Sequence, residues 1–320
     1  MWKYNYTVPE NKKIRLIVHT DCKNEADDQY ALVHHLMTSR FEIEGIIAGH
    51  FCKNPGEYVQ YGTAKASYDE ILKVLNLMGI NGMYPVLIGS DEAMRAESEP
   101  VDSEGARFII RQAMKKDDRP LYIACQGAVT DIASALLMKP EIAKKIIVIW
   151  VGGAAYPKGG FEFNLKMDIH AVNALFESRA EVWQIPMNVY KTFGVSLAEL
   201  QLKVKPCGEI GDYLFNQLVE FNYLVAEYNM AWPQGEIWVL GDQASIAVFM
   251  EELEQKNYDI IPALYVTKDM DYIHNQKNRP IRVYRQCEVR LTLEDFFSKL
   301  AINYMISELQ VIMLSEYCLF

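Results

Sequence analysis

The sequence lacks paired cysteines and long apolar runs, and each absence excludes a class of protein. Its six cysteines are scattered and form no CxxC pair, so neither a zinc cluster nor a redox dithiol is indicated. Isolated cysteines are typical of reduced thiols in a cytoplasmic protein, and the polar first residues contain no apolar signal core. No apolar run reaches the roughly 18 residues that a membrane-spanning helix needs. We therefore expect a soluble, cytoplasmic protein.

Positive charge is also scarce. The 32 Lys and Arg residues are outnumbered by 42 Asp and Glu residues, which gives a formal net charge of -10. Because no basic cluster is available to neutralise phosphates, nucleic acid is not an expected partner. An anionic membrane surface is a poor partner for the same reason.

No repeat, low-complexity segment or linker rich in Pro, Gly and Ser divides the 320 residues. Half of the residues are hydrophobic, which is ample for one large core. Apolar runs alternate with helical patterns, and this alternation predicts an α/β fold with a mostly parallel central sheet flanked by helices on both faces. We expect a single domain over residues 1–320, in which residues 290–320 form a C-terminal helical extension.

The expected elements follow this alternation. Strands are expected at 14–20, 41–50, 84–90, 120–127, 146–153 and 180–190, and helices at 26–39, 57–79, 104–116, 129–145 and 168–178. The second half is less regular, with helices expected at 208–230, 242–253 and 291–310, one strand at 258–267 and a hairpin within 270–290. In parallel sheets of this kind, ligands bind outside the carboxyl ends of the strands.

Polar residues stand at several of these expected strand ends. In chain order they are Asp21 with Asp27 and Asp28, then His50, Gln126, Glu162 and Asn164, and finally Asp242, which lies between an apolar run and a helix start. Parallel strands end at one edge of their sheet, so these side chains are expected to converge on one rim. That rim is the candidate active site.

The stretch HTDCKNEADD, residues 19–28, places Asp21, Glu25, Asp27 and Asp28 within eight positions. Crowded carboxylates repel and raise each other's pKa unless a cation neutralises them. Hard oxygen ligands select Ca²⁺ or Mg²⁺, although the spacing is not that of an EF-hand. In the alternative interpretation, Asp27 and Asp28 only begin a helix, where the dipole favours acidic residues. Asp21 and Asp242 favour the metal site because both are expected at the same place.

This stretch resembles the opening motif of the nucleoside hydrolase family, the inosine–uridine-preferring N-ribohydrolases, which reads Asp-x-Asp-Pro-Gly-x-Asp-Asp. Aligning the paired acids leaves five residues between Asp21 and Asp27, where the motif has three, so the chain carries a two-residue insertion. His19 stands at the first Asp of the motif. Further stretches resemble family segments in consistent order over roughly residues 14–250: IEGIIAGHF, IACQGAVTDIASALLMKPEI, IVIWVGGAA, FEFNLKMDIHA and LGDQASIAV. The second of these corresponds to Thr-Gly-Pro-Leu-Thr-Asn-Ile-Ala in the family.

The resemblance implies Ca²⁺-dependent hydrolysis of the N-glycosidic bond of a ribonucleoside or related N-glycoside, through an oxocarbenium-like transition state. It implies that Ca²⁺ is held by Asp21, Asp28, Asp242 and the backbone carbonyl of Gln126. Asp27 is then the general base that takes a proton from a metal-bound water. Family members commonly form dimers or tetramers, so a homodimer or homotetramer is expected.

The resemblance also implies which residues contact a nucleoside-like substrate. Glu162 and Asn164 fall where the family binds the ribose hydroxyls. Val151 falls at a substrate-contacting Met, and a role in the core is the equal alternative for it. Two further candidates come from position alone. His50 stands at an expected strand end, and Asn24 lies on the insertion, which is expected to reshape the sugar pocket.

Gly241 departs from the family, in which a His precedes the late Asp and helps the leaving base to accept a proton. The leaving-group acid is therefore open, and His50, Tyr190 and Lys191 are candidates only by their proximity to expected strand ends. A non-catalytic, metal-dependent nucleoside- or sugar-binding protein on the same scaffold is the alternative function. Asp27 favours an enzyme, because a binding site needs no base beside its metal ligands. A phosphohydrolase with an Asp nucleophile is disfavoured, since Lys23 stands where that chemistry expects a second Asp.

Overall fold

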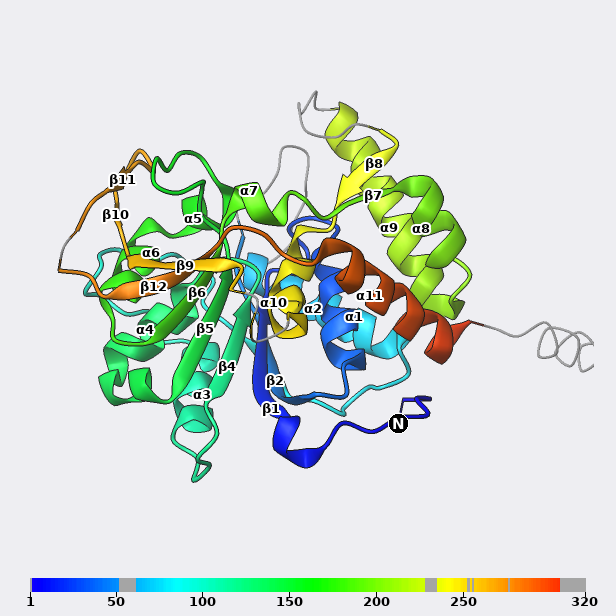
Figure 1. The fold of residues 1–320 in the computed structure, drawn as a ribbon, viewed down its shortest axis with the longest axis horizontal. Coiled ribbons are helices and arrows are strands. Elements are labelled where there is room, and N and C mark those ends of the chain that lie inside the picture. The colour runs from blue at the N-terminus through cyan, green and yellow to red at the C-terminus, as the bar shows by residue number, and fades with distance from the viewer. Residues whose placement is uncertain are drawn as a thin grey trace, which may run out of the picture.

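An eight-stranded sheet runs through the centre of the computed structural model, which describes residues 2–51, 62–227, 235–251, 254, 256–275 and 277–305 (Figure 1). Its strand order is β3-β2-β1-β4-β5-β6-β12-β9. All neighbouring strands are parallel except β12 and β9, which are antiparallel. The α/β fold with a mostly parallel sheet in a single domain is therefore confirmed.

The strands of this sheet are β1 Ile14–Thr20, β2 Phe41–Ala48, β3 Val86–Ile88, β4 Leu121–Cys125, β5 Ile146–Val151, β6 Glu181–Ile185, β9 Tyr258–Pro262 and β12 Pro280–Tyr284. Two antiparallel pairs lie outside it: β7 Gly194–Ser196 with β8 Ile237–Val239, and β10 Tyr265–Val266 with β11 Tyr272–Ile273. The helices are α1 Asp28–Met37, α2 Thr63–Leu77, α3 Glu104–Ala113, α4 Thr130–Met138, α5 Phe163–Met167, α6 Ile169–Glu177, α7 Met187–Tyr190, α8 Leu197–Lys203, α9 Gly208–Glu227, α10 Ala244–Met250 and α11 Val289–Tyr304. Single 3₁₀ turns lie at Glu10–Lys12, Pro140–Lys144 and Gly241–Gln243.

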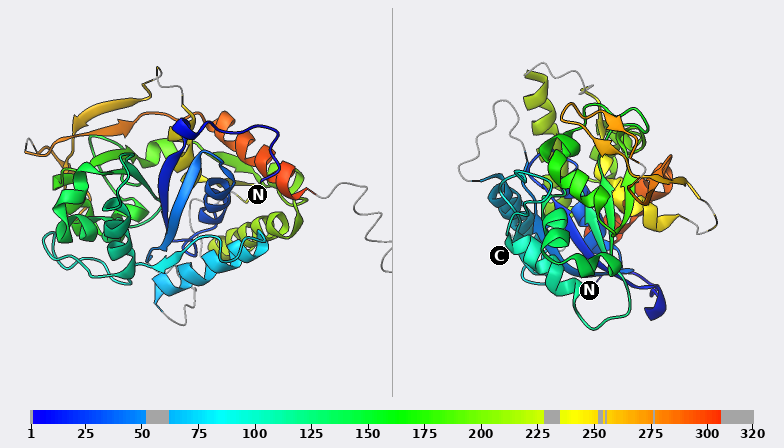
Figure 2. Two further views of the ribbon diagram at one scale, coloured as in Figure 1. Left: turned by 90° about the horizontal axis from the view of Figure 1, so that it is seen from below. Right: turned by 90° about the vertical axis from the view of Figure 1, so that its left-hand side faces the viewer.

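Helices cover both faces of the sheet, because successive strand side chains point to opposite faces. In β1, Leu16 and Val18 belong to the core beneath α1, α2, α9, α10 and α11. Ile17 points the other way, into the core beneath α3, α4 and α6. Figures 1 and 2 show the sheet between these two groups of helices. Among the described residues, no helix combines the length and the apolar character needed to cross a bilayer.

The strand order creates a crevice at the carboxyl ends of β1 and β4. From β1 the chain passes through α1 to β2 on one side, whereas from β4 it passes through α4 to β5 on the other side. The loops that follow β1 and β4 therefore diverge, and such a switch point is where α/β sheets bind ligands. Asp21 directly follows β1, and Gln126 directly follows β4.

Two prolines shorten elements that the periodicity predicts to be longer. The helix expected at 129–145 ends at Met138, two residues before Pro140, and a separate 3₁₀ turn follows. The strand expected at 180–190 ends at Ile185, and Pro186 precedes the short helix α7. Proline lacks an N–H donor and restricts the preceding residue, so it interrupts both types of element.

The strand pairing predicted for residues 258–290, at the β9 edge of the sheet, is wrong. The strand expected at 258–267 is two strands, of which β9 joins the main sheet and β10 pairs with β11. The hairpin expected within 270–290 does not form, because β11 pairs with β10 whereas β12 pairs with β9 and β6. Short strands of this kind find partners through tertiary contacts rather than through local pattern.

Four expected helices extend beyond what the structure describes or begin differently. For the helices expected at 57–79 and 208–230, residues 57–61 and 228–230 lie outside the described residues. The helix expected at 242–253 begins as a 3₁₀ turn. The last helix, α11, contacts α1, α9 and α10 and buries Phe296 and Leu300. Residues 306–320 lie outside the described part of the chain.

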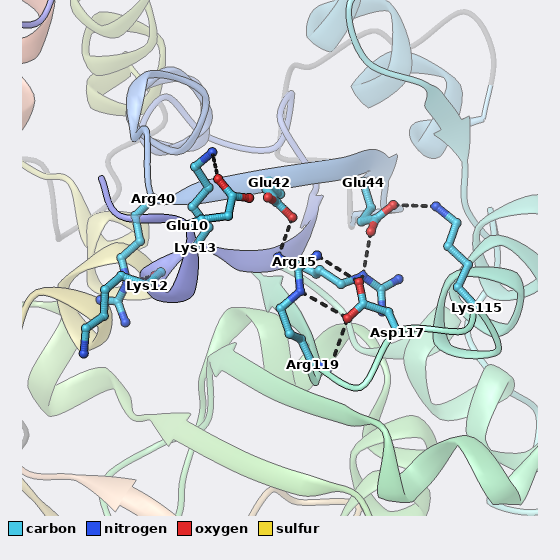
Figure 3. Close-up of polar contacts among 10 residues, drawn as sticks. All are labelled: Glu10, Lys12, Lys13, Arg15, Arg40, Glu42, Glu44, Lys115, Asp117 and Arg119. Carbon is cyan, nitrogen blue, oxygen red and sulfur yellow. Dashed lines mark hydrogen bonds and ion pairs between the residues drawn. The ribbon is translucent and has the colours of Figure 1, made fainter. Parts of the chain in front are cut away.

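An ion-pair network lies at the opposite end of the sheet from the crevice (Figure 3). Arg15 at the start of β1 is only 2% exposed. Its Nε lies 2.7 Å from Glu44 Oε1 and 3.5 Å from Asp117 Oδ2, and its Nη2 donates to the backbone oxygen of Gln112 at 2.9 Å. Arg119, which also pairs with Asp117, is far more exposed at 41%. Because burial removes solvent screening, Arg15 is expected to carry most of the stability of this network.

We expect Arg15→Met to lower the free energy of unfolding by about 3 kcal/mol, because it removes the buried guanidinium that donates to Glu44 and to the carbonyl of Gln112. Urea unfolding measures the change. Arg119→Met is the matched control and is expected to cost much less, since exposed ion pairs contribute little. Equal losses for the two variants would show that burial does not decide the contribution.

Candidate active site

One pocket collects the side chains at the carboxyl ends of the central strands. It is lined by nine of the ten residues predicted from the sequence to hold the metal, act as the base or contact the substrate: Asp21, Asn24, Asp27, Asp28, Gln126, Val151, Glu162, Asn164 and Asp242. Glu25, Phe163, Tyr190 and Gly241 complete the lining. Residues more than 200 positions apart in the chain therefore meet at the switch point of the sheet.

The loop after β1 folds back at once and delivers two acids to the first turn of α1. The backbone N–H groups of Lys23 and Asn24 both donate to the carbonyl oxygen of Asp21, at 2.5 and 2.7 Å. Helix α1 then begins at Asp28, directly after Asp27. Both side chains lie at the positive end of the helix dipole, which favours their ionised forms.

The acidic side chains of the pocket are held close together. Oxygens of Asp27, Asp28 and Asp242 lie within 4.8 Å of one another. Thr20 Oγ1 donates to Asp28 Oδ1 at 2.5 Å, and the backbone N–H of Asp242 donates to Asp27 Oδ2 at 3.1 Å. These bonds tie the end of β1, the start of α1 and the 3₁₀ turn at Gly241–Gln243 into one arrangement.

Burial raises the pKa values of these acids, and repulsion from neighbouring carboxylates adds to the shift for Asp21, Asp27 and Asp242. Burial, and then the neighbouring Asp28, raises the pKa of Asp27 to about 7. Burial raises the pKa of Asp28 to about 6. The pKa values of Asp21 and Asp242 are raised well above the usual range, first by burial and then by neighbouring carboxylates. A cation at this position would favour the ionised forms and reverse the shifts.

Gln126 connects the end of β4 to the acidic cluster. Its backbone N–H donates to the carbonyl of His19 at 2.9 Å, which continues the β1–β4 pairing by one residue. Its Nε2 donates to Ser245 Oγ at 2.9 Å, and Ser245 Oγ donates to the carbonyl of Asp242 at 2.6 Å. Gln126 Oε1 is buried and has no hydrogen-bond donor among the described residues. It is an unsatisfied acceptor beside the acids.

Glu162 is fixed in the pocket lining by several hydrogen bonds. It is the N-cap of α5, and its Oε2 accepts from the N–H groups of Gly153 at 2.7 Å and Leu165 at 2.9 Å. Gly153 has φ +82°, and a Cβ there would lie 2.3 Å from Gln184 Nε2, so only glycine fits. Tyr190 Oη donates to Glu162 Oε1 at 2.8 Å.

The remaining substrate-contact candidates separate into three that line the pocket and one that does not. Asn164 Nδ2 donates to the carbonyl of Val151 at 2.8 Å, and Asn24 Nδ2 donates to Asp21 Oδ2 at 3.0 Å. His50 is not among the described residues that line the pocket. Its Nε2 lies 2.9 Å from Thr130 Oγ1. His50 therefore supports α4 rather than facing the acids.

The comparison with protein families decides the identification. The model of the family described as "Inosine-uridine preferring nucleoside hydrolase" matches residues 16–295 of this chain. The chain belongs to this nucleoside hydrolase family. The resemblance stated from the sequence is thereby confirmed.

Individual members of the nucleoside hydrolase family are similar but distant. A pyrimidine-specific ribonucleoside hydrolase, RihA, of Salmonella paratyphi A is 25% identical over 202 residues, or 57% of this chain. That match spans 63% of the relative's own length. Among solved structures, a purine-preferring ribonucleoside hydrolase from Gardnerella vaginalis matches with a TM-score of 0.68 at 18% identity, covering 90% of this chain and 98% of that chain. The inosine-uridine preferring nucleoside hydrolase from Bacillus anthracis matches with a TM-score of 0.62 at 16% identity, covering 91% and 99%. The structural likenesses show a shared fold.

Two departures from the nucleoside hydrolase motifs, His19 and Asp131, contact each other. His19 replaces the first Asp of the opening motif, and Asp131 stands where the family segment has Asn. The two side chains pair at 2.8 Å and are both buried. Burial opposes protonation of His19, but Cys125 and Asp131 outweigh it and raise the pKa of His19 to about 10. In this chain the two departures therefore form one buried polar pair, with the acid at position 131.

Proposed function

We propose that this chain catalyses Ca²⁺-dependent hydrolysis of the N-glycosidic bond of a ribonucleoside or related N-glycoside, with Asp27 as the general base. The observation that carries the proposal is the buried group of Asp27, Asp28 and Asp242 at the switch point of the sheet, which lines the same pocket as Glu162. Membership of the nucleoside hydrolase family supports the same reaction.

The donor set fits a hard cation. Its proposed ligands are Asp21, Asp28, Asp242 and the carbonyl oxygen of Gln126, all oxygen donors of the kind that Ca²⁺ prefers. Burial, and then repulsion from neighbouring carboxylates, raises the pKa values of Asp21 and Asp242, which supports a counter-charge at this position. Ca²⁺, when bound, would lower the pKa of a coordinated water and orient the sugar diol.

Asp27 is suited to take a proton from the attacking water. It lines the pocket beside the proposed ligands, and the N–H of Asp242 holds one of its two oxygens. The other oxygen is the proposed proton acceptor. As the water attacks the anomeric carbon, the C–N bond breaks and its electron pair leaves with the base. The proton lost by the water passes to Asp27.

The rest of the pocket lining is suited to a sugar. Glu162, Asn164 and Val151, together with Asn24 beside Asp21, present two amide groups, one carboxylate and one apolar side chain to the pocket. A carboxylate accepts hydrogen bonds from hydroxyl groups, and amides both donate and accept. Such contacts fix the sugar so that the anomeric carbon stands near Asp27.

The products would be a free base and a sugar, which is the chemistry of purine and pyrimidine salvage. We further propose a cytoplasmic location, which the free thiols of Cys22, Cys125, Cys207 and Cys287 support. A homodimer or homotetramer stays a prediction, and light scattering on the purified chain tests it.

Nucleobase release from a panel of purine and pyrimidine nucleosides tests the function. We expect release in the presence of Ca²⁺ and at least a hundredfold loss after chelation, because the acids would repel one another and lose the cation that orients the diol. Adding back Ca²⁺ is the control and should restore release. If the chain binds Ca²⁺ but releases no base from any nucleoside, the metal-dependent binding function replaces the enzymatic one.

A further inference from the structure

Tyr190 lines the pocket between Glu162 and Gly241. It is the last residue of α7, which follows β6 at the same end of the sheet as α5 (Figure 1). Its hydroxyl donates to Glu162 Oε1 at 2.8 Å. Its ring lies against Gly241, where a Cβ would lie 2.9 Å from Tyr190 Cδ2 and 3.6 Å from Asp27 Oδ2. One side chain therefore contacts both Glu162 and Gly241, the residue that precedes the acid Asp242.

The backbone on each side of this contact is fixed. The N–H of Leu240 donates to the carbonyl of Phe193 at 2.9 Å, and β7 pairs with β8 immediately beyond. The segment that carries Gly241 is thus held against the segment that carries Tyr190. A larger residue at position 241 has to displace the Tyr190 ring, because the ring's own backbone cannot withdraw.

The hydrogen bond has a defined direction. Burial, and then the charge of Glu162, raises the pKa of Tyr190 well above its ordinary value. The phenol therefore stays protonated and donates a hydrogen bond to Glu162. Glu162 Oε1 is the acceptor, and it also receives the backbone N–H of Asn164 at 3.2 Å, so Tyr190 adds a side-chain donor to a backbone one. The other oxygen, Oε2, receives two backbone N–H groups. Donors therefore reach both oxygens and fix the orientation of the carboxylate, which remains available to a substrate hydroxyl on the pocket side.

We propose that Tyr190 is a positioning residue that fills the space left open by Gly241 and orients Glu162 toward a sugar hydroxyl of the substrate. This role rests on the nucleoside hydrolysis proposed above and deepens it. The glycine at 241 and the tyrosine at 190 act as one unit, because the ring can hold its place only while position 241 lacks a side chain.

Kinetics of Tyr190→Phe, Gly241→Ala and the double variant test the unit. We expect Tyr190→Phe to lower kcat/KM for a ribonucleoside about tenfold or more, since a hydrogen bond to a charged group is lost. Gly241→Ala should cause a similar loss by displacing the ring. The double variant should be no worse than the poorer single variant, because both changes break the same contact. Tyr304→Phe, which removes a bond to the Met78 carbonyl far from the pocket, is the control and should leave kcat/KM unchanged.

A panel of 2′-, 3′- and 5′-deoxynucleosides separates positioning from a general structural effect. For the substrate that lacks the hydroxyl bound by Glu162, Tyr190→Phe should no longer matter, and the tenfold loss should disappear. A loss of equal size on every substrate, or additive losses in the double variant, would overturn the proposal while leaving the hydrolase function intact. A wild-type chain that releases no base would instead overturn the proposed function and this role together. Thermal unfolding of each variant verifies that the fold is retained.

Discussion

Asp27→Asn is expected to lower kcat for nucleobase release by about 10²- to 10⁴-fold, the range typical of a removed general base. The substitution keeps the shape of the side chain and the bond from the Asp242 N–H to one of its oxygens. It removes only the oxygen that can take up a proton. Because the proposed ligands Asp21, Asp28 and Asp242 remain, we expect Ca²⁺ affinity to change by only a few fold. Single-turnover release measures the first quantity, and calorimetric titration with Ca²⁺ measures the second.

Two further variants, Asp28→Asn and Asp102→Asn, distinguish a general base from a metal ligand. Asp28→Asn should lose Ca²⁺ binding together with activity, because Asp28 is a proposed ligand with an oxygen within 4.8 Å of those of Asp27 and Asp242. Asp102→Asn changes an exposed acid that pairs with Arg107, and it should leave both quantities unchanged. If Asp27→Asn abolishes Ca²⁺ binding as completely as Asp28→Asn does, Asp27 is a ligand and the general base has to be another group.

Removing Ca²⁺ is expected to destabilise the fold, and to do so more strongly as the pH rises. In the metal-free protein the pKa of Asp27 is raised to about 7 and that of Asp28 to about 6, whereas an unfolded Asp titrates near pH 4. Between these values the folded state holds protons that the unfolded chain has released. The free energy of unfolding therefore falls as the pH rises from about 4 to about 7. Below pH 4 both states are protonated and this contribution is constant.

Ca²⁺ should reverse the loss at neutral pH, because it binds the ionised carboxylates of the folded state. At a concentration 100 times its Kd, a ligand specific for the folded state adds about 2.7 kcal/mol to the free energy of unfolding. Thermal unfolding at pH 5 and pH 8, with Ca²⁺ and with chelator, measures the effect. We expect a larger Ca²⁺-induced shift at pH 8. Shifts of equal size at both pH values would show that the raised carboxyl pKa values are not coupled to metal binding.

Much of the fold follows from local pattern. The alternation of apolar runs with helical stretches predicts the parallel sheet, since a strand buried on both faces needs a continuous apolar run and each crossover needs a helix. Position within that sheet then places Asp21 and Gln126 at strand ends, where the structure has them. The errors lie where short strands choose distant partners, as β9 and β12 do at the edge of the sheet.

The sequence by itself determined the α/β class, the family and the acids that meet at the pocket, because those depend on periodicity, on strand ends and on a motif. Only the tertiary structure decided that His19 pairs with Asp131, that His50 faces Thr130, and that Tyr190 fills the space beside Gly241. His19 and Asp131 are 112 positions apart. Such contacts depend on how helices and loops from distant parts of the chain pack around the sheet. No local spacing encodes that packing, so it becomes visible only when the core is assembled.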